Sequence, residues 1–300
     1  SNFMLNDGLY HISLMGGQAR AILIESTNLV QRAKDIHHLS RTATAALGRT
    51  LTMAAIMGSM LKNDSDSITA QIKGGGPIGT ILAVAHGDCS VKGYVGNPDV
   101  ELPRVGKKLP VGPAVGKDGK LTGIKDLHLK EPYVGQVNLV SGEIAEDFAM
   151  YFTASEQTPS LVSLGVLVSD EKVESAGGLL IQMLPGASEA AIASIENSAG
   201  MFMDISGTMR EYHLKDAVQQ LLLHLEPEVL QERTPQYRCD CSRERIERML
   251  VTLGRDELAD MIEKQHGAQV DCHFCNRRYE FSEDDLKTIL AAATAAQEDQ

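Results

Sequence analysis

The chain has 300 residues, of which 43% are hydrophobic and 23% are charged, and its formal net charge is -12. This length is sufficient for a sizeable hydrophobic core together with a second, smaller domain. The acidic balance argues against a nucleic-acid partner, because such binding depends on Lys and Arg side chains that neutralise phosphates. The sequence contains no apolar run of about 18 residues, so neither a transmembrane helix nor a membrane partner is expected.

The cellular compartment is indicated by the start of the chain and by its cysteines. Ser1-Asn2-Phe3-Met4 contains neither the basic nor the apolar segment of a secretory signal. We therefore expect a cytoplasmic protein in a compartment that keeps thiols reduced. Cys89 stands apart from the other four cysteines, and we expect a structural or surface residue without a redox partner.

Residues 1–182 predict an N-terminal core domain of the α+β class, in which helices accompany mixed sheets. Strands are expected where β-branched and apolar residues alternate or run together. These segments are the one around Ile22 and those at 67–73, 80–85, 91–95, 134–140, 161–168 and 178–183. Helices are expected at 42–61 and 142–155, and the glycines between 74 and 79 predict a tight strand connection rather than a phosphate loop.

The helix expected at 42–61 carries three methionines on one face: Met53, Met57 and Met60. Apolar stripes at this spacing usually pack into a core, and we favour that interpretation. The alternative is an adaptable surface that binds other proteins, because methionine is flexible and polarisable.

Residues 183–232 predict a helical linker. Pro185-Gly186 marks the change of pattern, and helical spacing of apolar residues continues from Ser188 to about Leu230. The second half of this segment contains Leu221, Leu222, Leu223 and Leu225. Such an apolar surface is too wide for a spacer in solvent, so we expect it to pack on the N-terminal domain.

Residues 233–294 predict a small C-terminal domain. Ser242 and Ser282 are placed to cap its first and last helices, and a middle helix is expected to end at Gly267. The first helix has an apolar face of Ile246, Met249, Leu250 and Leu253. A strand is expected around Tyr279 and Phe281. A domain of about 60 residues usually needs a staple in addition to its core.

Four cysteines in this domain form two close pairs, Cys-Asp-Cys and, 30 residues later, Cys-His-Phe-Cys. They are Cys239, Cys241, Cys272 and Cys275. Four thiolates complete the tetrahedral shell of a structural zinc ion, and this spacing in a reducing compartment favours metal over disulfides. His266 and His273 are alternative ligands, but four thiols already fill the shell.

A zinc–thiolate site is either a structural staple or a redox sensor, because the thiolate is both the ligand and the nucleophile that oxidants attack. Oxidation of the thiolates would release the metal, and a domain this small should then loosen or unfold. The cysteines are flanked by Arg238, Arg243, Arg277 and Arg278. These arginines are expected either to favour the thiolates or to be ordinary solvent-exposed residues.

The cysteine pattern, near the C-terminus of a chain of this length, resembles that of the bacterial redox-regulated heat-shock holdases, the 33 kDa chaperonin family. The resemblance extends to T-A-T-A-A-L-G-R-T, I-K-G-G-G-P-I-G, V-S-G-E, S-E-Q-T-P-S and A-G-G-L-L-I-Q-M-L-P-G, and thus to nearly the whole chain. It implies a stress chaperone without enzymatic turnover that binds unfolding client proteins without ATP. It also implies one zinc ion per chain in the reduced state.

The resemblance further implies how such a chaperone is switched on. Oxidants would join Cys239 to Cys241 and Cys272 to Cys275, release zinc, and disorder the zinc domain and the linker. The oxidised form would expose its client-binding surface and form homodimers. It would pass its clients to ATP-dependent chaperones once reductant returns.

Three other functions fit parts of the sequence. A thiol–disulfide oxidoreductase could use Cys272-His273-Phe274-Cys275, although such a motif normally begins a helix and here precedes a predicted strand. A zinc module could bind nucleic acid or a protein partner, although the acidic charge disfavours nucleic acid. An unswitched scaffold would keep its structural zinc under peroxide.

Overall fold

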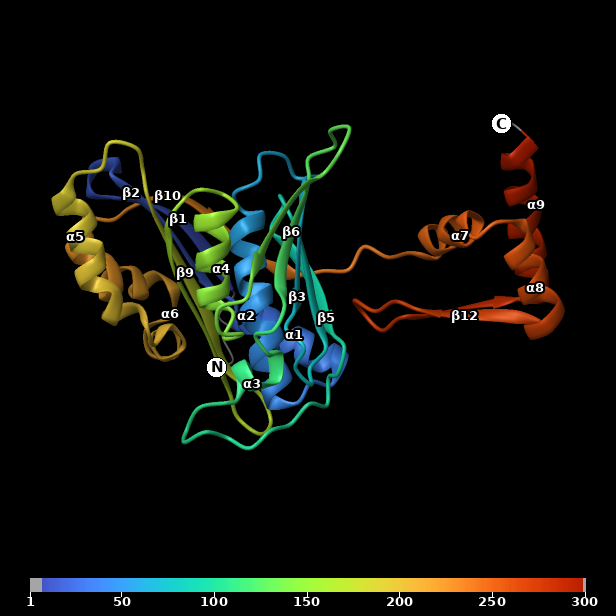
Figure 1. The fold of residues 1–300 in the computed structure, drawn as a ribbon, viewed down its shortest axis with the longest axis horizontal. Coiled ribbons are helices and arrows are strands. Elements are labelled where there is room, and N and C mark those ends of the chain that lie inside the picture. Colours follow the sequence, from blue (N-terminus) through green and yellow to red (C-terminus); the bar gives the residue numbers. More distant parts are fainter. Residues whose placement is uncertain (1–6, 299–300) are drawn as a thin grey trace, which may run out of the picture. The chain divides into compact units, whose positions relative to one another are not determined.

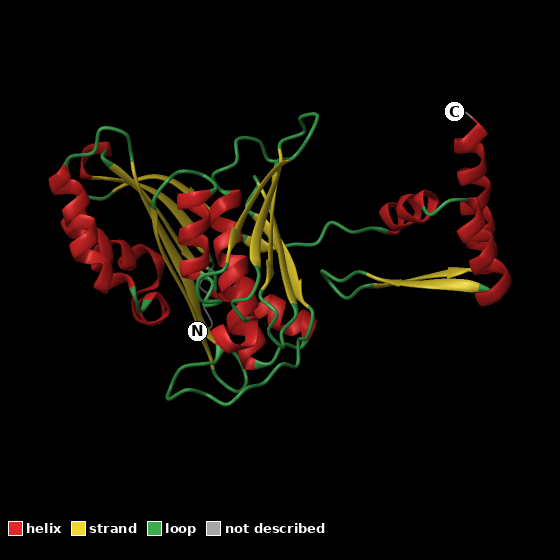
Figure 2. Ribbon diagram, viewed as in Figure 1, coloured by secondary structure: helices red, strands yellow, loops and turns green. Residues whose placement is uncertain are grey.

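The computed structural model of the chain describes residues 7–298 and divides between Arg238 and Cys239 into two compact units (Figure 1). Helices and strands are combined in both units, which confirms the α+β class (Figure 2). The four residues at the start of the chain, for which no secretory signal is expected, lie outside the described range. Within that range, no helix is long and apolar enough to cross a membrane.

A five-stranded antiparallel sheet forms one layer of the first unit, with the strand order β10-β1-β2-β9-β8. Its strands are β1 (Gly8–Leu14), β2 (Ala19–Glu25), β8 (Ser160–Val168), β9 (Val173–Met183) and β10 (Glu228–Arg233). A 3-10 turn, η1 (Met15–Gly17), joins β1 to β2. The strands expected around Ile22 and at 161–168 and 178–183 are confirmed, and β9 begins several residues earlier than its pattern indicates.

A six-stranded sheet forms a second layer, with the order β11-β5-β4-β3-β6-β7, in which only the short β11 is parallel to its neighbour. Its strands are β3 (Ser67–Lys73), β4 (Thr80–His86), β5 (Ser90–Val95), β6 (Lys120–Asp126), β7 (Tyr133–Asn138) and β11 (Gln236–Tyr237). The glycine cluster is the tight connection between β3 and β4. A side chain at Gly74 or Gly76 would collide with backbone atoms of residues 114–116, so this loop requires glycine.

Helices α1 (Thr27–His37), α2 (Arg41–Gly58), α3 (Val111–Val115) and α4 (Ala145–Ala154) belong to the same unit, and α1, α2 and α4 lie between the two sheets (Figure 1). Nearly every residue of α2 is buried, and its many Ala, Gly and Thr residues allow a sheet to approach on either side. Met53 and Met57 are buried and Met60 packs against the same core, which confirms core packing for the methionine stripe.

Helix α4 begins later than the predicted start at residue 142, because residues 140–144 form a loop around a buried carboxylate. Asp147 accepts hydrogen bonds from the backbone N–H groups of Val140, Ser141, Gly142 and Ile144. One carboxylate therefore accepts hydrogen bonds from all four backbone N–H groups and stabilises a non-helical loop, so that the helix begins only at Ala145.

The other face of the five-stranded sheet is covered by α5 (Glu189–Ser198), η2 (Ala199–Phe202), α6 (Ile205–Leu222) and η3 (Leu223–Leu225) (Figure 1). Leu222 and Leu225 are fully buried in a cluster with Leu23 and Leu179 of the sheet. Leu223, by contrast, is 62% exposed. The expectation that this leucine-rich helix packs on the N-terminal core is confirmed.

The helical pattern expected to continue to Leu230 is wrong at its end. The last 3-10 turn ends at Leu225, and Pro227 cannot continue a helix because it lacks a backbone N–H. Residues Glu228–Arg233 instead form β10, at the edge of the sheet beside β1. The side chains of β10 are mostly exposed, so backbone pairing rather than an apolar pattern defines this strand.

The second unit contains α7 (Arg243–Thr252), α8 (Arg255–Gln265), β12 (Gly267–Asp271), β13 (Arg278–Ser282) and α9 (Glu283–Glu298). Ser242 and Ser282 accept hydrogen bonds from the backbone N–H groups of Arg245 and Asp285, which confirms both helix caps. The small core contains Ile246, Leu250, Leu258, Tyr279, Phe281, Leu286, Ile289 and Ala293.

Two expectations for this unit are corrected, and one strand is not among those expected. Met249 and Leu253 are 46% and 42% exposed, so only half of the predicted apolar face of α7 is buried. Helix α8 ends at Gln265, and His266, rather than the expected Gly267, adopts the left-handed conformation that terminates it. The residues from Gly267 to Asp271 form β12, paired with β13, a strand that is not among those expected although Ala268 and Val270 alternate with Gln269 and Asp271 and pack against the core.

Candidate metal centre

The hairpin of β12 and β13 brings the two cysteine pairs together. Cys239 and Cys241 lie in the segment before α7, whereas Cys272 and Cys275 lie in the turn between the two strands. The turn is closed by two backbone hydrogen bonds, from Cys272 N to Arg277 O at 2.9 Å and from Asn276 N to Cys272 O at 2.7 Å. All four Sγ atoms lie within 4.8 Å of one another.

The sulfur spacing fits a tetrahedral metal ion. The Sγ atoms of Cys239 and Cys272 are 3.6 Å apart, and those of Cys241 and Cys275 are 3.4 Å apart. A shell with Zn–S bonds of about 2.3 Å has sulfur–sulfur edges of about 3.8 Å. The four cysteines therefore could hold one metal ion. Among the described residues, neither His266 nor His273 is part of this cluster.

The electrostatics of the cluster also favour a cation. Burial and the neighbouring thiols raise the pKa of Cys239, and they raise the pKa of Cys275 to about 11. Burial acts in the same direction on Cys241, but hydrogen bonds from the Tyr279 hydroxyl and the other thiols outweigh it and lower the pKa. The ionised form is thus favoured at Cys241 and disfavoured at Cys239 and Cys275, where a metal cation would offset the repulsion among the thiolates.

The four flanking arginines have different environments. Arg243 lies over the Phe281 ring, 4.2 Å from its centroid, and pairs with Asp285. Arg278 pairs with Asp271 in the hairpin, and Arg238 lies 4.0 Å from Asp88. Arg277 is exposed, and Tyr279, Cys241 and Cys275 together raise its pKa, so the thiolate-favouring effect stays a prediction for this position.

Tyr279 is the site residue that the sequence pattern does not reveal. We expect its ring in the strand, where it is buried, but its hydroxyl lies 3.2 Å from the Cys241 Sγ. The one signal in the sequence is that Tyr279 follows Cys275 by only four residues, on the strand that begins just after the turn, so its side chain must lie near the cysteines.

Two further expectations concern cysteines. Cys89 is buried and its burial raises the thiol pKa, so it is a structural rather than a surface residue. Cys272 and Cys275 precede strand β13 and not a helix, and so lack the helix N-terminus that activates the first thiol of a redox enzyme.

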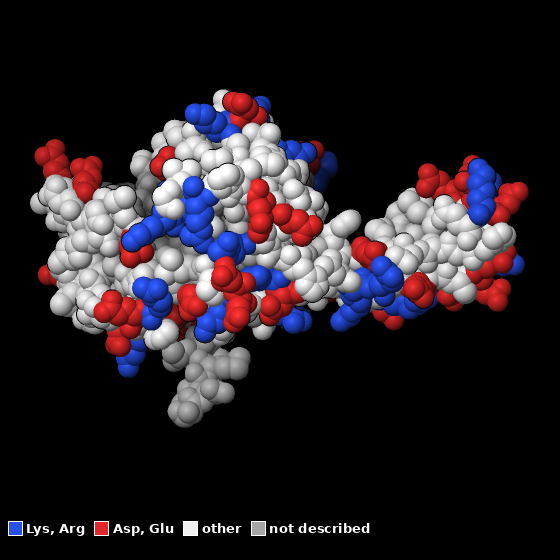
Figure 3. All heavy atoms as spheres, turned by 90° about the horizontal axis from the view of Figure 1, so that it is seen from below, with Lys and Arg blue, Asp and Glu red and all other residues white. Residues whose placement is uncertain are grey.

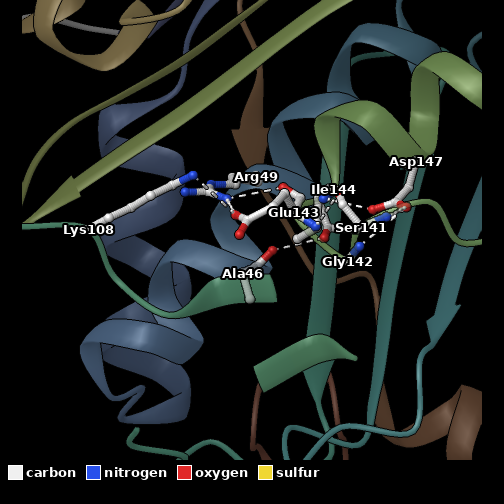
Figure 4. A network of polar contacts seen from close by, with 9 residues as sticks. Ala46, Arg49, Lys108, Ser141, Gly142, Glu143, Ile144 and Asp147 are labelled. Carbon is white, nitrogen blue, oxygen red and sulfur yellow. Dashed lines mark hydrogen bonds and ion pairs between the residues drawn. The ribbon is translucent and has the colours of Figure 1, made fainter. Parts of the chain in front are cut away.

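The first unit contains a polar network in which two of the quoted motifs meet (Figure 4). Arg49, from the L-G-R-T stretch, donates to Glu143, from V-S-G-E, with a distance of 3.0 Å between Nη1 and Oε2. Lys108 lies 3.9 Å from the same carboxylate. Arg49, Lys108 and Glu143 line a cavity of about 360 Å³ beside Phe202 and Met203. The conformation of the loop around Asp147 places Glu143 at this cavity.

Charged side chains do not form a basic stripe on the face seen in Figure 3, where Lys and Arg are interspersed with Asp and Glu over the first unit. A nucleic-acid-binding face would instead gather cations along one side. The distribution agrees with the acidic net charge of -12.

Comparison with known proteins identifies the family. The family model described as "Hsp33 protein" matches residues 7–282. The 33 kDa chaperonin of Clostridioides difficile is 48% identical over 91% of this chain and 95% of its own length, and that of Acetivibrio thermocellus is 45% identical over 95% and 97%. The crystal structure of the 33 kDa chaperonin from Thermotoga maritima superimposes with a TM-score of 0.87, at 36% identity, over 97% of this chain and all of that one. The chain belongs to the Hsp33 family of chaperones.

Proposed function

We propose that this chaperone is a redox-regulated, ATP-independent holdase whose sensor is one zinc ion bound by Cys239, Cys241, Cys272 and Cys275. The convergence of the four sulfurs at tetrahedral spacing is the observation that supports this proposal. The core of the second unit is small, so binding energy at the thiolates contributes directly to its folding. The zinc domain of this proposal comprises residues 233–294.

Oxidation would then act on the ligands themselves. Cys239 and Cys241 would form one disulfide, and Cys272 and Cys275 the other. Each pair of thiolates would give two electrons to peroxide, which takes up two protons and leaves as two water molecules. The thiolates are consumed as ligands, zinc is released, and the second unit loses the staple that holds it.

The client-binding surface is proposed to lie under the linker, residues 183–232, and on the linker itself. The segment from Ile195 to Leu225 covers the apolar face of the five-stranded sheet, four of whose strands lie in residues 1–182. Its release would expose sheet residues that are now buried, including Ile12, Leu23 and Leu179. A newly exposed apolar surface of this kind binds unfolding proteins or a second copy of the chain.

The remaining expectations complete the proposed cycle. The oxidised chaperone would act in the cytoplasm as a homodimer that holds unfolding clients. It would hand them to ATP-dependent chaperones when reductant restores the thiols. It would need no catalytic turnover of its own, in keeping with the name chaperonin that its relatives carry.

The deciding experiment follows the aggregation of a thermally unfolding test protein by light scattering, without ATP. Reduced, zinc-loaded chaperone is compared with chaperone treated with peroxide under mild heat. We expect suppression of aggregation by the oxidised form and little by the reduced form. If the two forms suppressed aggregation equally, the metal would have only a structural role and the proposed redox switch would be wrong. Peptide mass spectrometry of the oxidised form identifies which cysteines are paired.

A further inference from the structure

The hydroxyl of Tyr279 contacts the metal-binding cluster from the domain core. Its Oη lies 3.2 Å from the Sγ of Cys241, within the range of a hydrogen bond to sulfur. The ring is 7% exposed and packs in the core of the second unit, and the residue is fixed in β13 opposite Val270 of β12. The hydroxyl therefore has a defined direction, because neither the ring nor the strand is free to turn away.

A cation lies behind this hydroxyl. The cationic side chain of Arg277 interacts with the Tyr279 hydroxyl and with the thiols of Cys241 and Cys275, and these interactions raise its pKa. A guanidinium carries only donors, so it can approach the phenol only at the lone pairs of the oxygen. The hydroxyl proton then remains for the sulfur. A phenol that accepts from a cation donates more strongly, since hydrogen bonds in a chain polarise one another.

We propose that Tyr279 is a positioning residue that donates a hydrogen bond to the Cys241 thiolate and thereby slows the loss of the metal to oxidants. This inference depends on the proposed zinc site. The lone pairs of the thiolate sulfur form the metal bond and also attack the oxidant. A donor directed at that sulfur stabilises its negative charge, fixes its orientation toward the metal and reduces its reactivity.

The same contact explains why a tyrosine occupies this core position. Phe281, two residues along the same strand, is buried on the same face without a polar group. A tyrosine at such a position packs its ring in the core and leaves its hydroxyl at the edge, where the hydroxyl can meet a polar partner. The partner of Tyr279 is the cysteine cluster, so the core and the metal site are joined by one side chain.

The test is Tyr279→Phe in the full-length, zinc-loaded chain, which removes the hydroxyl and keeps the ring. We expect zinc affinity, measured by competition with a chromophoric chelator, to fall about tenfold. Peroxide should also release zinc faster, at a rate followed by the colour of the chelator. With Co²⁺ in place of zinc, the sulfur-to-metal charge-transfer band should shift to lower energy, because the sulfur lone pairs lose the donor that stabilised them.

Two exposed neighbours supply a matched pair. Arg277→Gln should shift affinity, release rate and band in the same direction by a smaller amount, whereas Arg278→Gln should change none of them, because Arg278 pairs with Asp271. The comparison of Arg277→Gln with Arg278→Gln tests the role of the Tyr279 hydroxyl even if Tyr279→Phe fails to fold. A wild-type chain that binds no metal would overturn the proposed site. A wild type that binds zinc, with Tyr279→Phe and Arg277→Gln indistinguishable from it, would overturn the role of Tyr279 alone.

Discussion

At the scale of single residues, two buried carboxylates lie beneath the break in helix α6. His213 interrupts the helix with a positive φ of 58°, and its Nδ1 lies 3.1 Å from the Oε2 of Glu25. Asp7 lies near Glu25 and accepts hydrogen bonds from the first backbone N–H groups of α1, those of Asn28 and Leu29. Burial raises the pKa of Glu25, and it raises the pKa of Asp7 to about 7.

These raised values make the stability of the first unit depend on pH. The folded chain binds the Asp7 proton more tightly than the unfolded chain, so this stabilising contribution is present in acid. It is lost as the pH rises from about 4 toward 7 and beyond. Asp7→Asn mimics the protonated carboxyl and removes the dependence. Its free energy of unfolding, relative to wild type, should rise by on the order of 2 kcal/mol between pH 5 and pH 8.

Denaturant unfolding at a series of pH values, followed by circular dichroism, measures this difference. Asp35→Asn is the matched control, because Asp35 lies on the exposed face of α1 and accepts from Gln31. A relative stability of Asp7→Asn that stays flat with pH would show that Asp7 is ionised throughout the range.

Single residues also mark the limit of what the sequence can predict. The spacing of the cysteines predicts their convergence, because short loops constrain each pair. Nothing in the spacing predicts that Tyr279 contacts Cys241, or that His213 contacts Glu25, 188 positions away along the chain. Such contacts depend on the mutual placement of elements, which local periodicity does not encode.

At the scale of elements, the linker combines a strongly packed helix with a weakly packed strand. Helix α6 and η3 bury Leu222 and Leu225 completely, whereas β10 leaves Val229 and Leu230 47% and 64% exposed. The helix is predictable because burial imposes a periodic apolar pattern on its sequence. The strand is not, because its backbone pairing with β1 requires no apolar side chains.

Neighbouring leucines test how firmly the helix is docked. Leu222→Ala should destabilise the first unit by about 2–5 kcal/mol, because it leaves a cavity against the sheet. Leu223→Ala, next along the chain, should change stability by less than about 0.5 kcal/mol, because that side chain is in solvent. The measurement is urea unfolding of the reduced, zinc-loaded chain. Equal effects of the two substitutions would contradict the docked arrangement of α6.

At the scale of the whole molecule, the two units depend on different sources of stability. The first has two sheets, with helices buried between them and a second apolar cluster on the outer face of one sheet. The second has one small core, to which α9 contributes Leu286, Ile289 and Ala293, although the family match ends at residue 282. The sequence predicts the α+β class and the compact cysteine region, but not the order of the strands, since pairing partners are distant in sequence.

Metal removal should therefore unfold one unit and spare the other. A strong chelator under reducing conditions is expected to abolish the helical circular dichroism contributed by residues 239–298, because the thiolates lose the cation that offsets their repulsion and the small core cannot compensate. The first unit should keep its own cooperative unfolding transition. Limited proteolysis should then yield a resistant fragment that ends near Arg238, and added zinc should restore the protected full-length chain.

Cys272→Ser provides the matched comparison, because it removes one ligand in the turn between β12 and β13 and leaves the buried core residues in place. It should reproduce the chelated state without chelator, whereas Cys89→Ser should retain its metal, because Cys89 lies outside the cluster. A second unit that resists protease after chelation would show that its hydrophobic core is sufficient by itself. Loss of metal could not then be the step that unfolds it, and oxidation would have to act through the new disulfides instead.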